Sequence, residues 1–172
     1  MPLSFAYGSN MDRAAMATRC PSSRPLGPAR LPGFRPVIMA QGWLSVVPDA
    51  RREVWGLLWE VALADIAALD RYEEVGAGLY RKVYRPVLTQ GGPRRALIYL
   101  GRDAGPGRAN PGYLEGVLAA ARELGLPASY LPDLAALAGT GRPSSACPPG
   151  RIGPGNADER RHPAVRPIAH RP

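Results

Sequence analysis

Apolar residues occur along the chain in short runs that predict strands separated by short helices. The run from Leu3 to Tyr7 is largely apolar and ends at Gly8. The segment Glu53–Val61 has apolar residues at both odd and even positions, which is typical of a strand covered on both faces. The predicted strands are Leu3–Tyr7, Phe34–Met39, Leu44–Val47, Glu53–Val61, Tyr80–Thr89 and Arg95–Leu100.

Residues that favour helix ends predict the positions of the helices. Asp12 is a typical first residue for a short helix, and Asn110 followed by Pro111 predicts an N-cap for a helix that runs to Leu124. The predicted helices are Asp12–Arg19, Ala64–Tyr72, Asn110–Leu124 and Ala128–Ala138. The prolines within residues 21–33 predict a loop around brief extended pieces.

The order of these elements predicts a fold of the α+β class. It lacks the regular βαβ alternation of a doubly wound sheet and favours a small mixed or antiparallel β-barrel, closed or nearly closed, with flanking helices. The pattern changes near residue 140, because residues 142–172 contain seven prolines, no aromatic residue and no apolar periodicity. We therefore expect one domain over residues 1–139 and a disordered tail over residues 140–172.

The net charge of +8 could indicate a nucleic-acid-binding protein, so its distribution matters. Residues 142–172 hold six arginines and two acidic residues, a net of +4, which is half of the excess. The chain shows no clustered basic stripe with stacking aromatics, and we expect no nucleic-acid partner. Binding of acidic polymers by the basic tail stays open as an alternative.

Several classes of site and location are not supported by the sequence. Cys20 and Cys147 lie too far apart to suggest a zinc site or a disulfide framework. No run approaches the roughly 18 apolar residues of a membrane span, and no signal peptide is evident. We expect a cytoplasmic protein with no membrane partner.

The chain also lacks the residues of the common catalytic machineries. His162 and His170 both lie in the expected tail, which leaves the domain without a histidine base for a Ser-His-Asp or Cys-His mechanism. There is no dinucleotide fingerprint and no Walker A loop. We expect no metal and no cofactor. The kind of catalysis that is still possible is carboxylate acid–base chemistry assisted by backbone groups.

Two local features fit that chemistry. Tyr7-Gly8-Ser9-Asn10 lies where a strand turns into a helix, and such a junction exposes backbone N–H groups that can hold an anion. Glu73 and Glu74 lie at the C-terminal end of a predicted helix, where the helix dipole disfavours negative charge. Taken singly, the first is also explained as an ordinary turn, and the second as a solvated acidic end paired with a nearby arginine.

Together the two features resemble the gamma-glutamylcyclotransferase-like family. That family has a Tyr-Gly-Ser-Asn loop after its first strand, and a Leu-Asp pair followed by Glu and then by a Tyr that begins a strand. The matching residues here are Tyr7, Gly8, Ser9, Asn10, Leu69, Asp70, Glu73 and Tyr80. The segments Val54–Val61 and Tyr113–Leu131 are also similar, so the resemblance spans about residues 3–138. Glu74 departs from the pattern, because the family usually has glycine there.

The resemblance implies an enzyme of glutathione metabolism that closes a gamma-glutamyl compound to 5-oxoproline and releases the attached amine. It implies that Glu73 is the general acid and base, and that Tyr7, Gly8, Ser9, Asn10 and Tyr113 bind the substrate. The substrate would be a small molecule, and a monomer suits such a barrel. Tyr113 is equally explained as a packed helix-face tyrosine. The alternative function is a non-catalytic member of the fold that binds a small metabolite or a partner protein.

A general base of this kind must have an unusual environment. The α-amine of the substrate has a pKa of about 8 and an ordinary glutamate about 4.3, so proton transfer between them is costly. We therefore expect Glu73 to lie in a partly desolvated pocket beside the glycine loop, with Glu74 turned away. The leaving group is not identified by the sequence.

Overall fold

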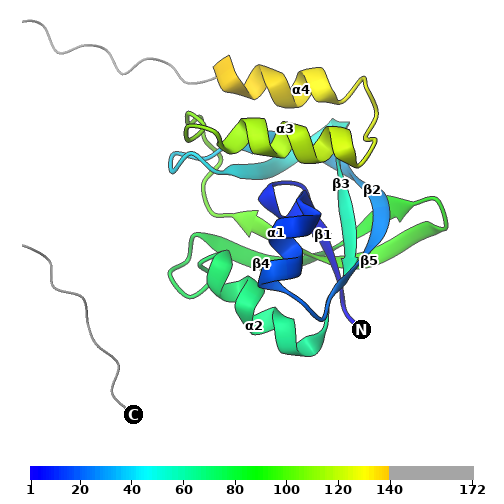
Figure 1. Ribbon diagram of the computed structural model, residues 1–172. Coiled ribbons are helices and arrows are strands. Elements are labelled where there is room, and N and C mark those ends of the chain that lie inside the picture. The colour runs from blue at the N-terminus through cyan, green and yellow to red at the C-terminus, as the bar shows by residue number, and fades with distance from the viewer. Residues whose placement is uncertain (140–172) are drawn as a thin grey trace, which may run out of the picture. The chain divides into compact units, whose positions relative to one another are not determined.

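Five strands close into a barrel in the computed structural model, which describes residues 1–139 (Figure 1). The strands are β1 (Leu3–Ala6), β2 (Arg24–Ile38), β3 (Leu44–Glu60), β4 (Tyr80–Thr89) and β5 (Gly92–Gly101). Their order around the barrel is β1-β3-β2-β4-β5, and β1 closes the ring by pairing with β3 in antiparallel and with β5 in parallel orientation. The prediction of a mixed barrel in an α+β domain is confirmed.

β1 packs closely against β3 at its last residue. Ala6 pairs with Leu57, and a side chain at the neighbouring Gly56 would overlap the carbonyl oxygen of Ala6. Because glycine has no Cβ, β1 can approach β3 closely at this position. The chain then leaves the sheet at Tyr7 and enters the loop that precedes the first helix.

The structure corrects the prediction of two separate strands at Leu44–Val47 and Glu53–Val61, which form the single strand β3. It also corrects the predicted loop over residues 21–33, most of which belongs to β2. The pairing of β2 with β3 accommodates the prolines through register shifts at Pro25/Gly27 and Pro32/Phe34. On its other edge β2 pairs with β4 only at Arg30 and Leu88, so prolines without an N–H group cost little there.

The helices are η1 (Ser9–Met11), α1 (Arg13–Arg19), α2 (Leu63–Tyr72), α3 (Tyr113–Glu123), α4 (Leu131–Ala136) and η2 (Leu137–Gly139). Asp12 is the N-cap of α1, because its Oδ1 accepts hydrogen bonds from the N–H groups of Ala14 and Ala15 at 2.9 and 3.0 Å. The predicted N-cap at Asn110 is wrong, since α3 begins after Gly112 and the Asn110 amide donates to the carbonyl of Gln41 instead.

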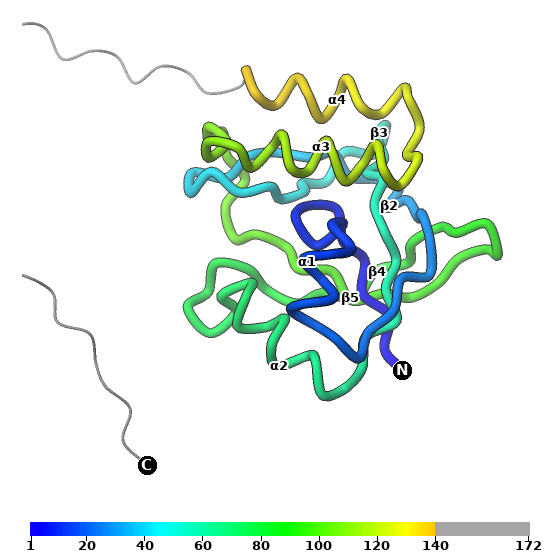
Figure 2. Tube along the Cα trace, in the orientation of Figure 1, coloured from blue at the N-terminus to red at the C-terminus, as the bar shows by residue number. Residues whose placement is uncertain are grey.

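The helices lie around the segment that follows β1. α3 and α4 pack side by side, and η1 and α1 lie between α3 and α2 (Figures 1 and 2). The short helices η1 and α1, which follow β1, therefore lie next to helices that come much later in the sequence. This arrangement places the Tyr7–Asn10 loop close to the ends of both α2 and α3.

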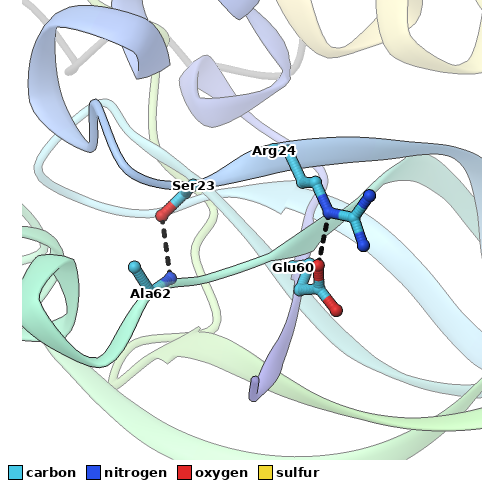
Figure 3. Close-up of polar contacts among 4 residues, drawn as sticks. All are labelled: Ser23, Arg24, Glu60 and Ala62. Atoms are coloured by element: carbon cyan, nitrogen blue, oxygen red, sulfur yellow. Dashed lines mark hydrogen bonds and ion pairs between the residues drawn. The ribbon is translucent and has the colours of Figure 1, made fainter.

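The start of α2 is fixed by a buried carboxylate. Asp65 is only 6% exposed, and its Oδ2 accepts hydrogen bonds from the N–H of Ser22 at 3.0 Å and the hydroxyl of Ser23 at 2.7 Å. The Ser23 hydroxyl oxygen accepts in turn from the N–H of Ala62 at 3.1 Å (Figure 3). An ion pair between Arg24 and Glu60 lies next to this contact (Figure 3). The segment after α1 and the segment before α2 are thereby joined.

The expected tail at residues 140–172 lies outside the described residues. Among residues 1–139, no helix is long and apolar enough to cross a membrane.

Candidate active site

The loop after β1 is held in place by its first residue. Tyr7 is buried, and its hydroxyl donates to the backbone carbonyl of Tyr99 in β5 at 2.5 Å. The N–H groups of Met11 and Asp12 bond to the carbonyls of Gly8 and Ser9, which turns the chain into η1. A Cβ at Gly8 would lie 3.0 Å from the hydroxyl of Tyr113, so glycine allows this tyrosine to lie against the loop.

The C-terminal end of α2 presents Glu73 as the residue that caps the helix. The N–H of Glu74 bonds to the carbonyl of Arg71, and the N–H of Val75 bonds to that of Asp70. These two bonds form a Schellman motif, in which Glu74 occupies the left-handed position with φ of 49°. The motif turns the chain sharply, and Glu74 is exposed while Glu73 is partly buried.

Asp70 fixes the last turn of α2 against the barrel. Its Oδ1 accepts from the hydroxyl of Tyr99 and its Oδ2 from the ammonium of Lys82, both at 2.7 Å. Tyr99 belongs to β5 and Lys82 to β4. The Leu-Asp pair of the sequence motif therefore positions the glutamate that follows it.

The loop and the helix end meet directly. The side-chain amide of Asn10 donates to Oε1 of Glu73 at 2.6 Å, and the hydroxyls of Ser9 and Tyr72 lie 2.9 Å apart. The backbone carbonyl of Asn10 also accepts from the indole N–H of Trp59 in β3 at 3.0 Å. Residues that are 63 positions apart are thus brought into one cluster, with Glu73 beside the glycine loop.

A small cavity of about 40 Å³ lies at this junction. Its lining includes all six of the predicted site residues: Tyr7, Gly8, Ser9, Asn10, Glu73 and Tyr113. Tyr80 and Tyr99 complete a polar wall. Burial raises the pKa values of the Tyr7, Tyr80, Tyr99 and Tyr113 hydroxyls, so they remain protonated and able to donate hydrogen bonds at neutral pH.

The carboxyl group of Glu73 has a pKa raised from 4.5 to about 7. Burial is the cause of the rise, and it is partly offset by the positive charge of Arg19 and by the hydrogen bond from Asn10. A group with this pKa exists in both protonation states near neutral pH, so it can accept and return a proton.

A wider outer chamber of about 270 Å³ adjoins the cavity. The two share Ser9, Glu73, Tyr80 and Tyr113, so Glu73 lies at their junction. The chamber has a largely aromatic and apolar wall of Trp43, Tyr72, Leu79, Tyr80 and Tyr113, together with the side of Glu74. The rings of Trp43 and Tyr113 meet edge to face, with centroids 5.0 Å apart.

The position of Trp43 depends on contacts between the turn that contains it and the segment before α3. The N–H of Asn110 bonds to the carbonyl of Gly42, and its side-chain amide to that of Gln41. Gly42 has φ of 83°, and a Cβ there would lie 2.6 Å from the Asn110 side chain. Asn110 was expected to begin a helix, but it instead holds the turn that contains Trp43 through these hydrogen bonds.

Sequence reasoning missed Arg19, Trp43 and Tyr72. Arg19 ends α1, donates to Oδ1 of Asn10 and places its guanidinium 3.3 Å from the centre of the Tyr72 ring. No spacing links these residues along the chain, because the contacts depend on how α1 and α2 pack. Within residues 1–139 there is no group of three or more histidine, cysteine or carboxylate side chains that could hold a metal ion.

Known proteins resemble this chain in both sequence and fold. Residues 53–134 match the AIG2-like family. Human and mouse proteins named gamma-glutamylcyclotransferase are each 29% identical over 148 residues, which is 78% of this chain and 78% of each relative. A solved structure named gamma-glutamyl cyclotransferase superimposes with a TM-score of 0.75 at 27% identity, covering 85% of this chain and 92% of the other.

Proposed function

The chain belongs to the gamma-glutamylcyclotransferase-like family, and we propose that it catalyses the cyclisation of a gamma-glutamyl compound to 5-oxoproline. The α-amine of the substrate attacks its own γ-carbonyl, a new C–N bond closes the five-membered ring, and the original amide C–N bond breaks. In becoming the ring N–H the α-ammonium gives up two protons, and the leaving nitrogen takes up two as it departs as an ammonium ion. The nucleophile belongs to the substrate, so the enzyme has to hold a ring-closing conformation and relay these protons.

The observation that carries this proposal is the environment of Glu73. A carboxyl with a pKa of about 7 lies about one unit below an α-amine of about 8, which corresponds to about 1.4 kcal/mol. An ordinary carboxyl would lie about 4 units lower, a cost of about 5 kcal/mol. Partial desolvation thus makes Glu73 a suitable relay that takes the ammonium proton and returns it to the leaving nitrogen.

The loop at residues 8–10 suits the other requirement of the reaction, stabilisation of the oxyanion that forms at the γ-carbonyl. No described residue accepts a hydrogen bond from the N–H groups of Gly8 or Asn10, and the loop lines the same cavity as Glu73. We assign these donors, together with the nearby hydroxyl of Tyr113, to the substrate carbonyl. Tyr7 has its hydroxyl bonded to Tyr99, and we assign it to shaping the cavity wall that contacts the substrate.

The two chambers suggest how the substrate lies. Glu73 must reach both the α-amine and the leaving nitrogen, and it lies at the junction of the inner cavity and the outer chamber. We therefore place the glutamyl part in the inner cavity and the leaving amine in the outer chamber. The aromatic wall of Trp43, Tyr72 and Tyr113 suits a leaving group with an apolar surface.

The test is a screen for 5-oxoproline release over gamma-glutamyl amino acids and gamma-glutamyl amines, with Glu73→Gln and Glu74→Gln as a matched pair. We expect Glu73→Gln to lose at least a hundredfold in kcat, the low end for removal of a general base, and Glu74→Gln to stay within about threefold. Loss of activity in Glu74→Gln alone would refute the assignment. Ligand binding by the wild type without product from any substrate would favour a non-catalytic binding protein.

The same variant tests the origin of the raised pKa without substrate. A carboxyl whose folded-state pKa is raised stabilises the fold below its unfolded value of about 4.5, and this contribution is lost as pH rises through about 7. Glu73→Gln has no such loss, so it should be the more stable protein at pH 8 by up to about 3 kcal/mol and equal to the wild type near pH 4. Urea unfolding at both pH values measures the difference. A variant that is less stable at pH 8 would contradict a desolvated Glu73.

A further inference from the structure

Arg19 reaches the site from a helix that otherwise lies outside it. It is the last residue of α1, is partly buried, and donates from Nη1 to the side-chain carbonyl oxygen of Asn10. Its guanidinium also covers the ring of Tyr72, with 3.3 Å between Cζ and the ring centre. The hydroxyl of Tyr72 is paired with Ser9, so both contacts of Arg19 lead to the glycine loop.

The contact between Arg19 and Asn10 determines which way the Asn10 amide faces. An asparagine side chain has one end that accepts hydrogen bonds and one that donates, and these ends can exchange places by a half-turn. A guanidinium can only donate, so it requires the carbonyl oxygen of Asn10 on its side. The NH2 group must then face Oε1 of Glu73, where the distance is 2.6 Å.

An amide that donates to a carboxyl group favours the ionised form of that group, and an amide carbonyl in the same place would favour the protonated form. We propose that Arg19 is a positioning residue that fixes the Asn10 amide as a donor and so holds Glu73 as the ionised base that begins the reaction. This inference rests on the proposed function for its catalytic meaning. It does not require Arg19 to touch the substrate, and Arg19 does not line the cavity.

The other titratable groups near Glu73 do not supply this effect. Burial raises the pKa values of the surrounding phenols, which are uncharged near neutral pH: Tyr7, Tyr80, Tyr99 and Tyr113. Asp70 is paired with Lys82 and Tyr99, and Glu74 is exposed to solvent. Among the described residues, Arg19 supplies the positive charge that acts on Glu73.

The test compares Arg19→Met with Arg19→Lys, and uses Arg13→Met as the control. Methionine keeps apolar contact with Tyr72 but removes the donor and the charge, whereas lysine keeps a charge and a donor. Arg13 is exposed in the first turn of the same helix and has no role in the site. Titration of the Glu73 carboxyl carbon by NMR, assigned with Glu73→Gln, reads the effect directly and needs no substrate.

We expect the midpoint for Glu73 to rise by about one unit in Arg19→Met, because the Asn10 amide is no longer held as a donor and the positive charge is lost. Arg19→Lys should restore part of the shift, and Arg13→Met should match the wild type. The acid limb of kcat/KM should move upward with the NMR midpoint, while KM changes less than about twofold because the substrate contacts remain.

A wild-type midpoint in Arg19→Met, with native circular dichroism, would overturn the proposal. So would an activity loss that is the same at every pH, because it would indicate damage to packing only. Asn10→Ala provides the second check: if Arg19 acts through Asn10, adding Arg19→Met to Asn10→Ala should shift the midpoint less than Arg19→Met does alone. Absence of product from every substrate with the wild type would refute the proposed function, and the NMR titration would still decide the role of Arg19.

Discussion

Glu74 has a backbone conformation that favours glycine. It is the one non-glycine residue with a positive φ, 49°, in the described part of the chain. Left-handed backbone costs a residue with a Cβ about 1–2 kcal/mol, and the left-handed position of a Schellman motif is usually glycine. The glycine that the related family usually has at this place therefore has a local conformational explanation.

Replacing Glu74 with glycine should stabilise the protein. The relief of the left-handed strain is partly offset by the greater freedom of glycine in the unfolded chain, which leaves a gain of about 1 kcal/mol. Activity should be largely retained, since Glu74 is exposed and does not line the inner cavity. Urea unfolding gives the free energy, and 5-oxoproline release gives the activity.

Ala77→Gly is the matched control for this change. Ala77 is exposed in the same turn and has no positive φ, so glycine there should destabilise by about 0.5–1 kcal/mol. Equal effects of the two substitutions, or a destabilised Glu74→Gly, would show that the conformation of Glu74 is not strained.

The sequence predicted six of the residues that line the cavity but not Arg19, Trp43 or Tyr72 beside them. Tyr7–Asn10 and Glu73 were identified as one site by their resemblance to a family, because each alone is explained as a turn or a helix end. Arg19 has no such signal, since its contact with Asn10 depends on the length and direction of α1. Trp43 and Tyr72 were missed for the same reason.

At the scale of elements, α2 is held at both ends by carboxylates. Asp65 joins its first turn to Ser22 and Ser23, and Asp70 joins its last turn to Lys82 and Tyr99. Glu73 follows directly after this helix. The position of the proposed base thus depends on hydrogen bonds at both ends of α2, and those of Asp65 lie outside the cavity.

Asp65→Ala should destabilise the protein by about 2 kcal/mol, because it removes two hydrogen bonds to a buried charged group. It should also increase amide hydrogen exchange in α2 more than in the barrel strands. Exchange measured by NMR or mass spectrometry, together with urea unfolding, tests both parts.

Asp133→Ala is the control, since Asp133 makes an ion pair with Arg52 in which both side chains are more than 40% exposed. An exposed pair contributes about 0–1 kcal/mol, so this variant should remain close to the wild type. A cost for Asp65→Ala no larger than that for Asp133→Ala would show that the start of α2 is not anchored by Asp65.

Strand positions were predicted well where apolar runs had clear ends and poorly where prolines interrupted them. Tyr80–Thr89 was predicted with the bounds of β4, and Leu3–Tyr7 differs from β1 by one residue. Within β2, proline was expected to stop the strand, but the nearly unpaired edge and the register shifts remove most of its cost. A single sequence does not reveal which edge of a strand will be paired.

At the scale of the molecule, closure of the barrel creates the site. Strand β1 completes the ring between β3 and β5, and this carries the Tyr7–Asn10 loop to the place where α2 ends and α3 begins. The cavity lining runs from Ser4 to Tyr113 in sequence. The α+β class could be predicted from the order of the elements. The meeting of these distant residues could not, because it depends on the pairing of β1 with both β3 and β5.

The chain divides into two units after Arg142, and we expect catalytic activity to depend on the first unit alone. Every residue that lines the cavity or the outer chamber lies between Ser4 and Tyr113, and the unit that holds the barrel ends at Arg142. A variant without residues 143–172 loses five arginines and two acidic residues, a net of +3 out of +8. It should keep kcat/KM within about twofold, because it retains every described residue that lines the site.

The variant without residues 143–172 should bind a polyanion more weakly than the full chain, although its activity should be unchanged. Retention on immobilised heparin reports electrostatic attraction, which weakens as salt screens it. We expect the full chain to elute at higher salt than the shortened one, with both variants equally active in 5-oxoproline release. Equal elution would show that the C-terminal arginines do not form a polyanion-binding segment. Loss of activity with an unchanged melting temperature would show that residues after 142 take part in the site, so that residues 1–139 are not a complete catalytic unit.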